Sequence, residues 1–213
     1  MKPRAILFDL DGTLTDSSEG ILACVKESLK PFGIDLPRAT LTEFIGPPLT
    51  WSYPHFCGLT QEQTERAVAA FQARYAVEGK FENRVYSGIP AVLSALSERG
   101  YLLAVATSKP EVFAREIIAH FSLDALFATV RGGDLKESGT KADVIRRVLS
   151  DLSLSPAEAV MVGDRRHDIL GAREVGLAGV GVLWGFGSAE ELCESGAAAL
   201  ARTPEDLLTL FSA

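Results

Sequence analysis

Two closely spaced carboxylates point to chemistry in this sequence. Asp9 and Asp11 follow an apolar stretch, residues 5–8, and are separated by Leu10. On an extended chain they would point the same way and repel each other unless a cation lay between them. Hard oxygen ligands suit magnesium, and Gly12 permits a tight turn whose backbone N–H groups can face an anion. An Asp-Gly pair is also common in ordinary turns, so this stretch alone leaves both interpretations open.

Further polar residues follow other apolar runs along the chain. Thr107 and Ser108 end one run, Asp164 ends another, and Asp168 comes four residues after Asp164. Lys141 opens the helical segment before that second run. Carboxylates can hold a metal ion, while hydroxyl, amide and ammonium groups can bind phosphoryl oxygens. These residue types predict a magnesium-assisted phosphate site.

Each of these residues also has a simpler explanation. Thr107 with Ser108, and Asp164, could merely cap the helices that follow them. Lys141 taken alone is better explained as a solvated residue of a first helical turn. Their joint placement, in this order and at the ends of separate strands, favours the phosphate site over these separate explanations.

The elements that must position these residues alternate between strand and helix after residue 85. We expect strands at residues 5–8, 101–107, 126–130, 157–162 and 179–183, with a final edge strand at 197–201. We expect helices at residues 17–33, 37–45, 60–78, 89–99, 110–120, 140–152, 166–175, 189–194 and 204–211. This alternation predicts an α/β fold with a Rossmann-like parallel sheet, whose right-handed crossovers bring the carboxyl ends of all strands to one edge. Residues 17–84 show no convincing strand.

Composition narrows the class of protein. The chain has 213 residues, 47% of them hydrophobic, which is ample for a core. Its net charge of -7 argues against nucleic acid as the main partner. No apolar run is long enough to span a membrane, and three distant cysteines predict no disulfide framework. We expect a soluble, cytoplasmic protein, a monomer or a homodimer, that binds neither nucleic acid nor membrane.

With these motifs in order, the sequence resembles the haloacid dehalogenase (HAD) superfamily of phosphohydrolases over essentially its whole length. Asp9-Leu10-Asp11-Gly12-Thr13 is similar to the first motif of that superfamily, and Thr107 with Ser108 to the second. Lys141 is similar to the third, and the segment from Gly163 to Asp168 to the fourth. The resemblance implies a core domain of residues 1–15 and 85–213, with an all-helical cap domain, residues 16–84, inserted after the first strand.

The resemblance also implies roles for individual residues. Asp9 would be the nucleophile that forms an aspartyl-phosphate, and Asp11 the general acid and base. Asp9 and Asp164 would bind Mg²⁺ through their side chains and Asp11 through its backbone carbonyl, while Asp168 would support the metal shell or orient Lys141. The phosphoryl oxygens would be bound by Gly12, Thr107, Ser108 and Lys141.

The implied activity is that of a phosphoric monoester hydrolase acting on a small phosphorylated metabolite. Within the superfamily the chain looks most like the phosphoglycolate-phosphatase branch, and a 5′-nucleotidase is the alternative. Asp11 favours an oxygen leaving group, because a halide needs no acid. A phosphomutase stays a minor alternative. A non-catalytic module on the same fold would have lost part of the site, whereas every member is present.

Residues 16–84 are expected to select the substrate, since the core residues recognise only phosphate. An aromatic group could stack on a nucleobase, although such residues more often form a core. Phosphoglycolate would instead call for a cationic group. The aromatic and imidazole side chains are Trp51, Tyr53, His55, Phe56, Phe71, Tyr75 and Phe81, and the cationic ones are Lys26, Arg38, Arg66, Arg74, Lys80 and Arg84.

Overall fold

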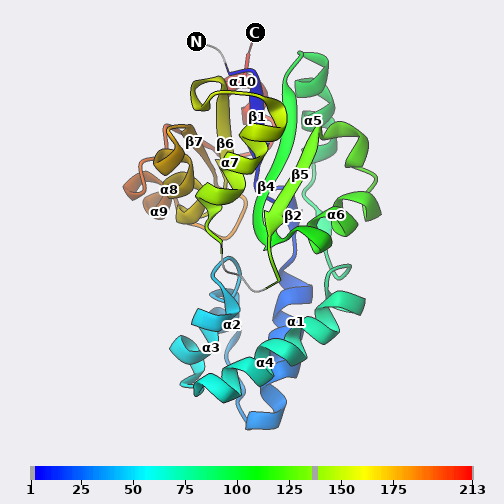
Figure 1. The fold of residues 1–213 in the computed structure, drawn as a ribbon, viewed down its shortest axis with the longest axis vertical. Coiled ribbons are helices and arrows are strands. Elements are labelled where there is room, and N and C mark those ends of the chain that lie inside the picture. Colours follow the sequence, from blue (N-terminus) through cyan, green and yellow to red (C-terminus); the bar gives the residue numbers. More distant parts are fainter. Residues whose placement is uncertain (1–2, 136–138, 213) are drawn as a thin grey trace. The chain divides into compact units, whose positions relative to one another are not determined.

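The fold is seen in a computed structural model, which describes residues 3–135 and 139–212 (Figure 1). The chain forms two compact units. The core unit comprises Met1–Thr15 and Val85–Ala213, and the helical unit comprises Asp16–Arg84.

The core unit contains a six-stranded sheet in the order β5-β4-β1-β6-β7-β8, with every neighbouring pair parallel. This confirms the predicted α/β fold with a parallel sheet. The strands are β1 (Ala5–Phe8), β4 (Leu102–Pro110), β5 (Thr129–Gly133), β6 (Ala159–Gly163), β7 (Ala178–Val182) and β8 (Ala199–Ala201). β1 lies in the middle, with Phe8 opposite Val105 of β4 and Val162 of β6. The carboxyl ends of these three strands therefore meet at one point of the sheet edge.

Helices cover both faces of this sheet because side chains of a strand alternate between its faces. Ile6 and Phe8 join a cluster with residues of α5, α6 and α10, whereas Ala5 and Leu7 join a cluster with residues of α7 and α8. All four residues of β1 are fully buried. The helices are α5 (Ile89–Glu98), α6 (Glu111–His120), α7 (Lys141–Leu152), α8 (Arg166–Val175), α9 (Ala189–Glu194) and α10 (Asp206–Leu210).

Two strands, β5 and β4, differ most from the sequence prediction. The strand expected at 126–130 begins only at Thr129 and runs to Gly133, because a 3-10 turn occupies Asp124–Leu126. β4 also continues past Thr107 to Pro110. Glycine usually weakens a strand, but here its missing side chain is required. A Cβ on Gly132 would overlap the carbonyl of Lys109, so only glycine lets β5 approach the end of β4.

The helical unit contains α1 (Ser18–Leu29), α2 (Arg38–Thr42), α3 (Leu49–Cys57) and α4 (Gln61–Arg74). A capping box begins α4, since Thr60 and Gln63 exchange hydrogen bonds. At the start of α1, Asp16 accepts hydrogen bonds from the backbone N–H and hydroxyl of Ser18.

The two chain segments that join the units pair with each other. β2 (Thr15–Asp16) and β3 (Arg84–Val85) form a two-stranded sheet, which the sequence did not predict. Arg84 donates hydrogen bonds from Nε and Nη2 to Asp16 Oδ2 at 3.1 and 2.7 Å. Among the described residues, no helix is both long enough and apolar enough to cross a membrane.

Candidate active site

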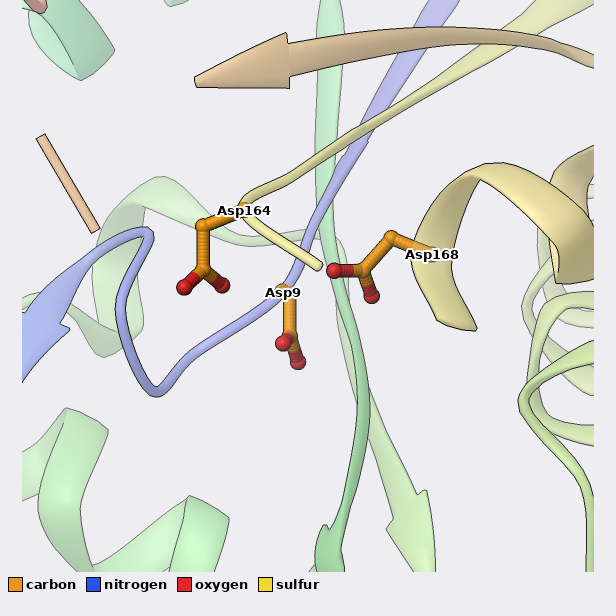
Figure 2. A group of neighbouring side chains, drawn as sticks. All are labelled: Asp9, Asp164 and Asp168. Atoms are coloured by element: carbon orange, nitrogen blue, oxygen red, sulfur yellow. The ribbon is translucent and has the colours of Figure 1, made fainter. Parts of the chain in front are cut away.

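Three carboxylates converge at the carboxyl ends of the central strands (Figure 2). Asp9 directly follows β1, Asp164 directly follows β6, and Asp168 lies in the first turn of α8. Each offers one oxygen, and these oxygens all lie within 4.8 Å of one another. The side chains are almost fully buried, with Asp164 completely inaccessible. Close-packed carboxylates in a dry environment repel each other strongly unless positive charge compensates them.

Lys141 supplies positive charge to this group from the first position of α7. Its Nζ lies 2.8 Å from Asp9 Oδ1 and 2.8 Å from Asp168 Oδ1, and it donates to the carbonyl of Ala106 at 3.1 Å. Thr140 precedes it as a helix cap that exchanges hydrogen bonds with Asp143, which fixes where α7 begins. Lys141 is thus a buried partner of Asp9, 132 residues away in sequence, and not a solvated surface residue.

The electrostatics of the group follow from its burial. Burial would lower the pKa of Lys141, but the Asp168 and Asp9 carboxylates outweigh it and hold that pKa above its ordinary value. Burial, together with the charge of Asp9, raises the pKa of Asp168 to about 6, although Lys141 opposes this rise. Burial and the charges of Asp168 and Asp9 raise the pKa of Asp164 well above its ordinary value. One ammonium group therefore does not neutralise the three acids.

This imbalance is the test of whether the residues fit a metal ion. Three buried carboxylates with one ammonium among them leave excess negative charge, and their oxygens are the ligand type that Mg²⁺ prefers. Asp9, Asp164 and Asp168 fit a divalent cation. The sequence treated Asp168 only as a supporting residue, whereas the structure brings its side chain into the same group as those of Asp9 and Asp164.

Asp11 lies apart from that group. β1 ends at Phe8, so the chain is not an extended strand from Asp9 to Asp11, and the two side chains contact different lysines. Asp11 Oδ2 lies 2.8 Å from Nζ of Lys109. Its other carboxylate oxygen is buried and accepts no hydrogen bond from the described residues. Asp9 and Asp11 therefore have different surroundings, and the roles predicted for them stay predictions.

Sequence reasoning missed Lys109 as a partner of Asp11. Lys109 directly follows Ser108 but was not among the predicted site residues. Thr107 is buried, and its hydroxyl accepts a hydrogen bond from the backbone N–H of Lys109 at 3.3 Å, while Ser108 is exposed. The end of β4 thus presents a hydroxyl and an ammonium beside the turn that holds Asp11.

Gly12 is required by the geometry of the turn after β1. Its φ of +81° lies in the left-handed region, and a Cβ there would overlap the carboxylate of Asp164. Its N–H donates to the carbonyl of Thr15 at 2.7 Å and thereby closes the turn. The predicted role of Gly12 in phosphate binding stays a prediction.

In the helical unit, several candidate substrate-binding residues have partners within the unit. Arg74 donates hydrogen bonds from both terminal nitrogens to Glu82, and Arg84 pairs with Asp16. The aromatic side chains of Tyr53, Phe71 and Tyr75 are buried in the core of the unit, whereas Trp51 is half exposed and stacks on His55 with ring centroids 4.3 Å apart. Tyr53, Phe71 and Tyr75 therefore pack the unit, as aromatic residues at helical spacing usually do, while Trp51, His55 and Phe81 are exposed.

Comparisons with known proteins agree on the family. Residues 6–182 match the family described as "Haloacid dehalogenase-like hydrolase". A protein of Pseudomonas aeruginosa named 5′-nucleotidase is 48% identical over 88% of this chain and 86% of its own length. Phosphoglycolate phosphatase 1 of the same organism is 30% identical over 97% of this chain and 79% of its own length.

Two further similarities extend this picture. Tyrosine-protein kinase PtkA of Mycobacterium tuberculosis is 40% identical over 88% of this chain, but the match spans only 65% of that longer protein. The crystal structure of a predicted phosphatase from Clostridium acetobutylicum superimposes with a TM-score of 0.93 and 40% identity, over 99% of this chain and 98% of that one.

Proposed function

Because the chain belongs to the haloacid dehalogenase-like hydrolase family and is a phosphoric monoester hydrolase, we propose that it hydrolyses a small phosphate monoester with Mg²⁺ through an aspartyl-phosphate on Asp9. The observation that carries this proposal is the buried group of Asp9, Asp164 and Asp168 with Lys141 paired to Asp9. A nucleophilic carboxylate needs a fixed direction, and the ammonium of Lys141 supplies it by holding one oxygen of Asp9 at 2.8 Å.

The first step transfers the phosphoryl group to the protein. A carboxylate oxygen of Asp9 attacks phosphorus, the bond from phosphorus to the ester oxygen breaks, and Asp11 donates a proton to the departing oxygen. Thr107, Ser108 and Lys141 bind the phosphoryl oxygens while their charge redistributes. Asp11 contacts Lys109 through Oδ2 at 2.8 Å, and its Oδ1 accepts no hydrogen bond from the described residues, so the leaving group can meet Oδ1 without displacing Lys109.

The second step regenerates the carboxylate. Asp11 takes a proton from a water molecule, which attacks phosphorus, and the bond between phosphorus and the Asp9 oxygen breaks to release inorganic phosphate. A bound Mg²⁺ would supply charge neutralisation for the approach of the phosphate dianion to Asp9. Asp9, Asp164 and Asp168 would hold it with their side chains, and Asp11 with its backbone carbonyl.

For the substrate we place nucleoside monophosphates first. The resemblance seen in the sequence alone ranked phosphoglycolate first, but identity to the named 5′-nucleotidase is 48%, against 30% to the named phosphoglycolate phosphatase. We assign substrate choice to residues 16–84, since the core residues named above recognise only phosphate. Values of kcat/KM with Mg²⁺ for nucleoside monophosphates, phosphoglycolate and sugar phosphates decide the order.

Trapping of the intermediate tests the mechanism. Wild-type protein mixed with radiolabelled substrate and quenched in acid should retain label on Asp9, and Asp9→Asn should retain none. Asp11→Asn should slow esters of poor leaving groups far more than aryl phosphates, because a good leaving group needs little help from an acid. No turnover of an aryl phosphate by the wild-type protein with Mg²⁺, or an Asp9→Asn variant as active as the wild type, would refute the proposed function.

A further inference from the structure

The loop after β7, residues 184–187 (Trp-Gly-Phe-Gly), contacts two of the proposed catalytic segments. The indole Nε1 of Trp184 donates a hydrogen bond to the carbonyl of Thr13 at 3.0 Å. Two residues later, the backbone N–H of Phe186 donates to Asp164 Oδ2 at 2.8 Å. One short loop therefore connects the turn that carries Asp11 to a candidate metal ligand.

The glycines of this loop make the approach close. A Cβ on Gly185 would overlap the carbonyl of Gly12, and a Cβ on Gly187 would overlap the carbonyl of Asp164. The ring of Phe186 lies so near Gly12 that a Cβ on Gly12 would overlap it as well. Aromatic and glycine residues thus alternate in this loop, and its two glycines let its backbone lie against both segments.

The loop is itself anchored to the sheet. The backbone N–H of Leu183 donates to the carbonyl of Ala201 in β8 at 2.9 Å, and the partly buried Trp184 packs against the larger apolar cluster of the core unit. The turn at Thr13 can therefore move only if the indole hydrogen bond breaks or the loop leaves the edge of the sheet.

We propose that residues 184–187 are a positioning segment of the active site, which holds the Asp164 carboxylate and the turn at Thr13 in register for cation and phosphate binding. Asp164 needs this support because the neighbouring carboxylates of Asp9 and Asp168 repel it. Apart from the Phe186 N–H, its only other hydrogen bond from a described side chain is a long one, 3.4 Å from the hydroxyl of Thr13. The Phe186 N–H occupies Oδ2, and Oδ1, which accepts only the long hydrogen bond from Thr13, can bind a cation. This assignment rests on the proposed function.

Replacing Trp184 by Phe tests the segment, because Phe keeps an aromatic ring but cannot donate to Thr13. We expect the dissociation constant for Mg²⁺, measured by titration calorimetry, to rise roughly 3- to 10-fold, the range set by one lost hydrogen bond. In samples without Mg²⁺, amide hydrogen exchange in peptides covering residues 10–15 should be faster in Trp184→Phe than in the wild type. Trp184→His, whose imidazole can donate a hydrogen bond, should show smaller changes than Trp184→Phe in both measurements.

Tyr101→Phe is the matched control. The Tyr101 hydroxyl also donates to a backbone carbonyl, that of Phe211 at 3.2 Å, but among residues with no part in the candidate site. Tyr101→Phe should lower the unfolding temperature about as much as Trp184→Phe does, and it should leave both the Mg²⁺ affinity and the amide exchange of residues 10–15 unchanged. Gly187→Ala changes the other end of the segment. Its added Cβ should displace Asp164 and thereby weaken Mg²⁺ binding.

The outcomes separate the two proposals. Folded Trp184→Phe and Gly187→Ala proteins with wild-type Mg²⁺ affinity and exchange would overturn the positioning role, as would equal effects of Tyr101→Phe. A wild-type protein that binds Mg²⁺ but hydrolyses no phosphate ester would refute the proposed function, and the calorimetric and exchange measurements would still decide the role of residues 184–187.

Discussion

Removal of the buried ammonium of Lys141 gives the most informative test of the site. Its side chain is only 5% exposed and forms ion pairs of 2.8 Å with Asp9 and Asp168. Lys141→Met keeps an apolar chain of similar length and leaves two buried carboxylates facing each other. Removing one partner of a buried pair costs about 3–5 kcal/mol of unfolding free energy, and we expect the upper part of this range in EDTA at pH 7.

The cost should depend on pH with a definite sign. Without Lys141 the pKa of Asp168, already raised to about 6, rises further, because Lys141 lowers it more than the other lowering contact, the backbone N–H of Arg165, does. The native variant can then bind a proton that the unfolded chain releases near pH 4. Acidification from pH 7 to pH 5 should therefore shrink the loss in Lys141→Met, since protonation of Asp168 replaces the missing cation.

Urea denaturation in EDTA measures the effect, with Trp184 fluorescence reporting the core unit in a Trp51→Phe background. The double variant Lys141→Met/Asp168→Asn is the control. Because it removes one of the two carboxylates that repel each other in Lys141→Met, it should restore more than half of the lost stability. Addition of Mg²⁺ should stabilise Lys141→Met more than the wild type. A loss below about 1 kcal/mol, or a double variant no more stable than the single one, would refute a charge-balanced site.

Three further predictions follow from other groups. In EDTA, the unfolding free energy of the wild type minus that of Asp168→Asn should rise as pH falls from above 6 toward 4, because the folded pKa of Asp168, about 6, exceeds the unfolded value of 3.8. Urea denaturation of both proteins at pH 4.5 and pH 7 measures this, and a difference that is the same at both pH values contradicts it. Arg74→Met, which loses two hydrogen bonds to one carboxylate, should destabilise the helical unit by about 1.5–3 kcal/mol in urea, whereas loss of the exposed ion pair in Lys30→Met should cost less than about 0.5 kcal/mol. Gly12→Ala should lower kcat at least 10-fold, since φ is +81° and the added Cβ displaces Asp164; an unchanged kcat in steady-state assays would contradict this.

The fold could be predicted because β1, β6 and the first part of β4 are unbroken apolar runs that end in polar residues. Asp9 and Asp164 lie where such runs stop, and parallel strands bring those ends together. The shift of β5 to Thr129 could not be predicted, because glycines argue against a strand unless the neighbouring backbone is known to approach closely.

The polar contacts of the site were harder to foresee. The pairing of Lys141 with Asp9 depends on how α7 packs against the sheet, and no local pattern around a single lysine carries that information. The same holds for Lys109 with Asp11 and for Trp184 with Thr13, where residues far apart in sequence meet through the topology of the sheet. Residue types at strand ends indicate the chemistry, while the tertiary contacts decide which partner each residue has.

The pairing of β2 with β3 has a consequence for how this chain can change over evolution. Because the chain leaves and re-enters the core through two hydrogen-bonded strands, residues 16–84 form one closed loop whose ends are held together by that pairing. The entropy of closing such a loop grows only with the logarithm of its length, so a tenfold shorter excursion would lower the closure cost by about 2 kcal/mol. The core can therefore exchange this insertion for one of very different size at small cost, and the catalytic and substrate-selecting parts can diversify separately.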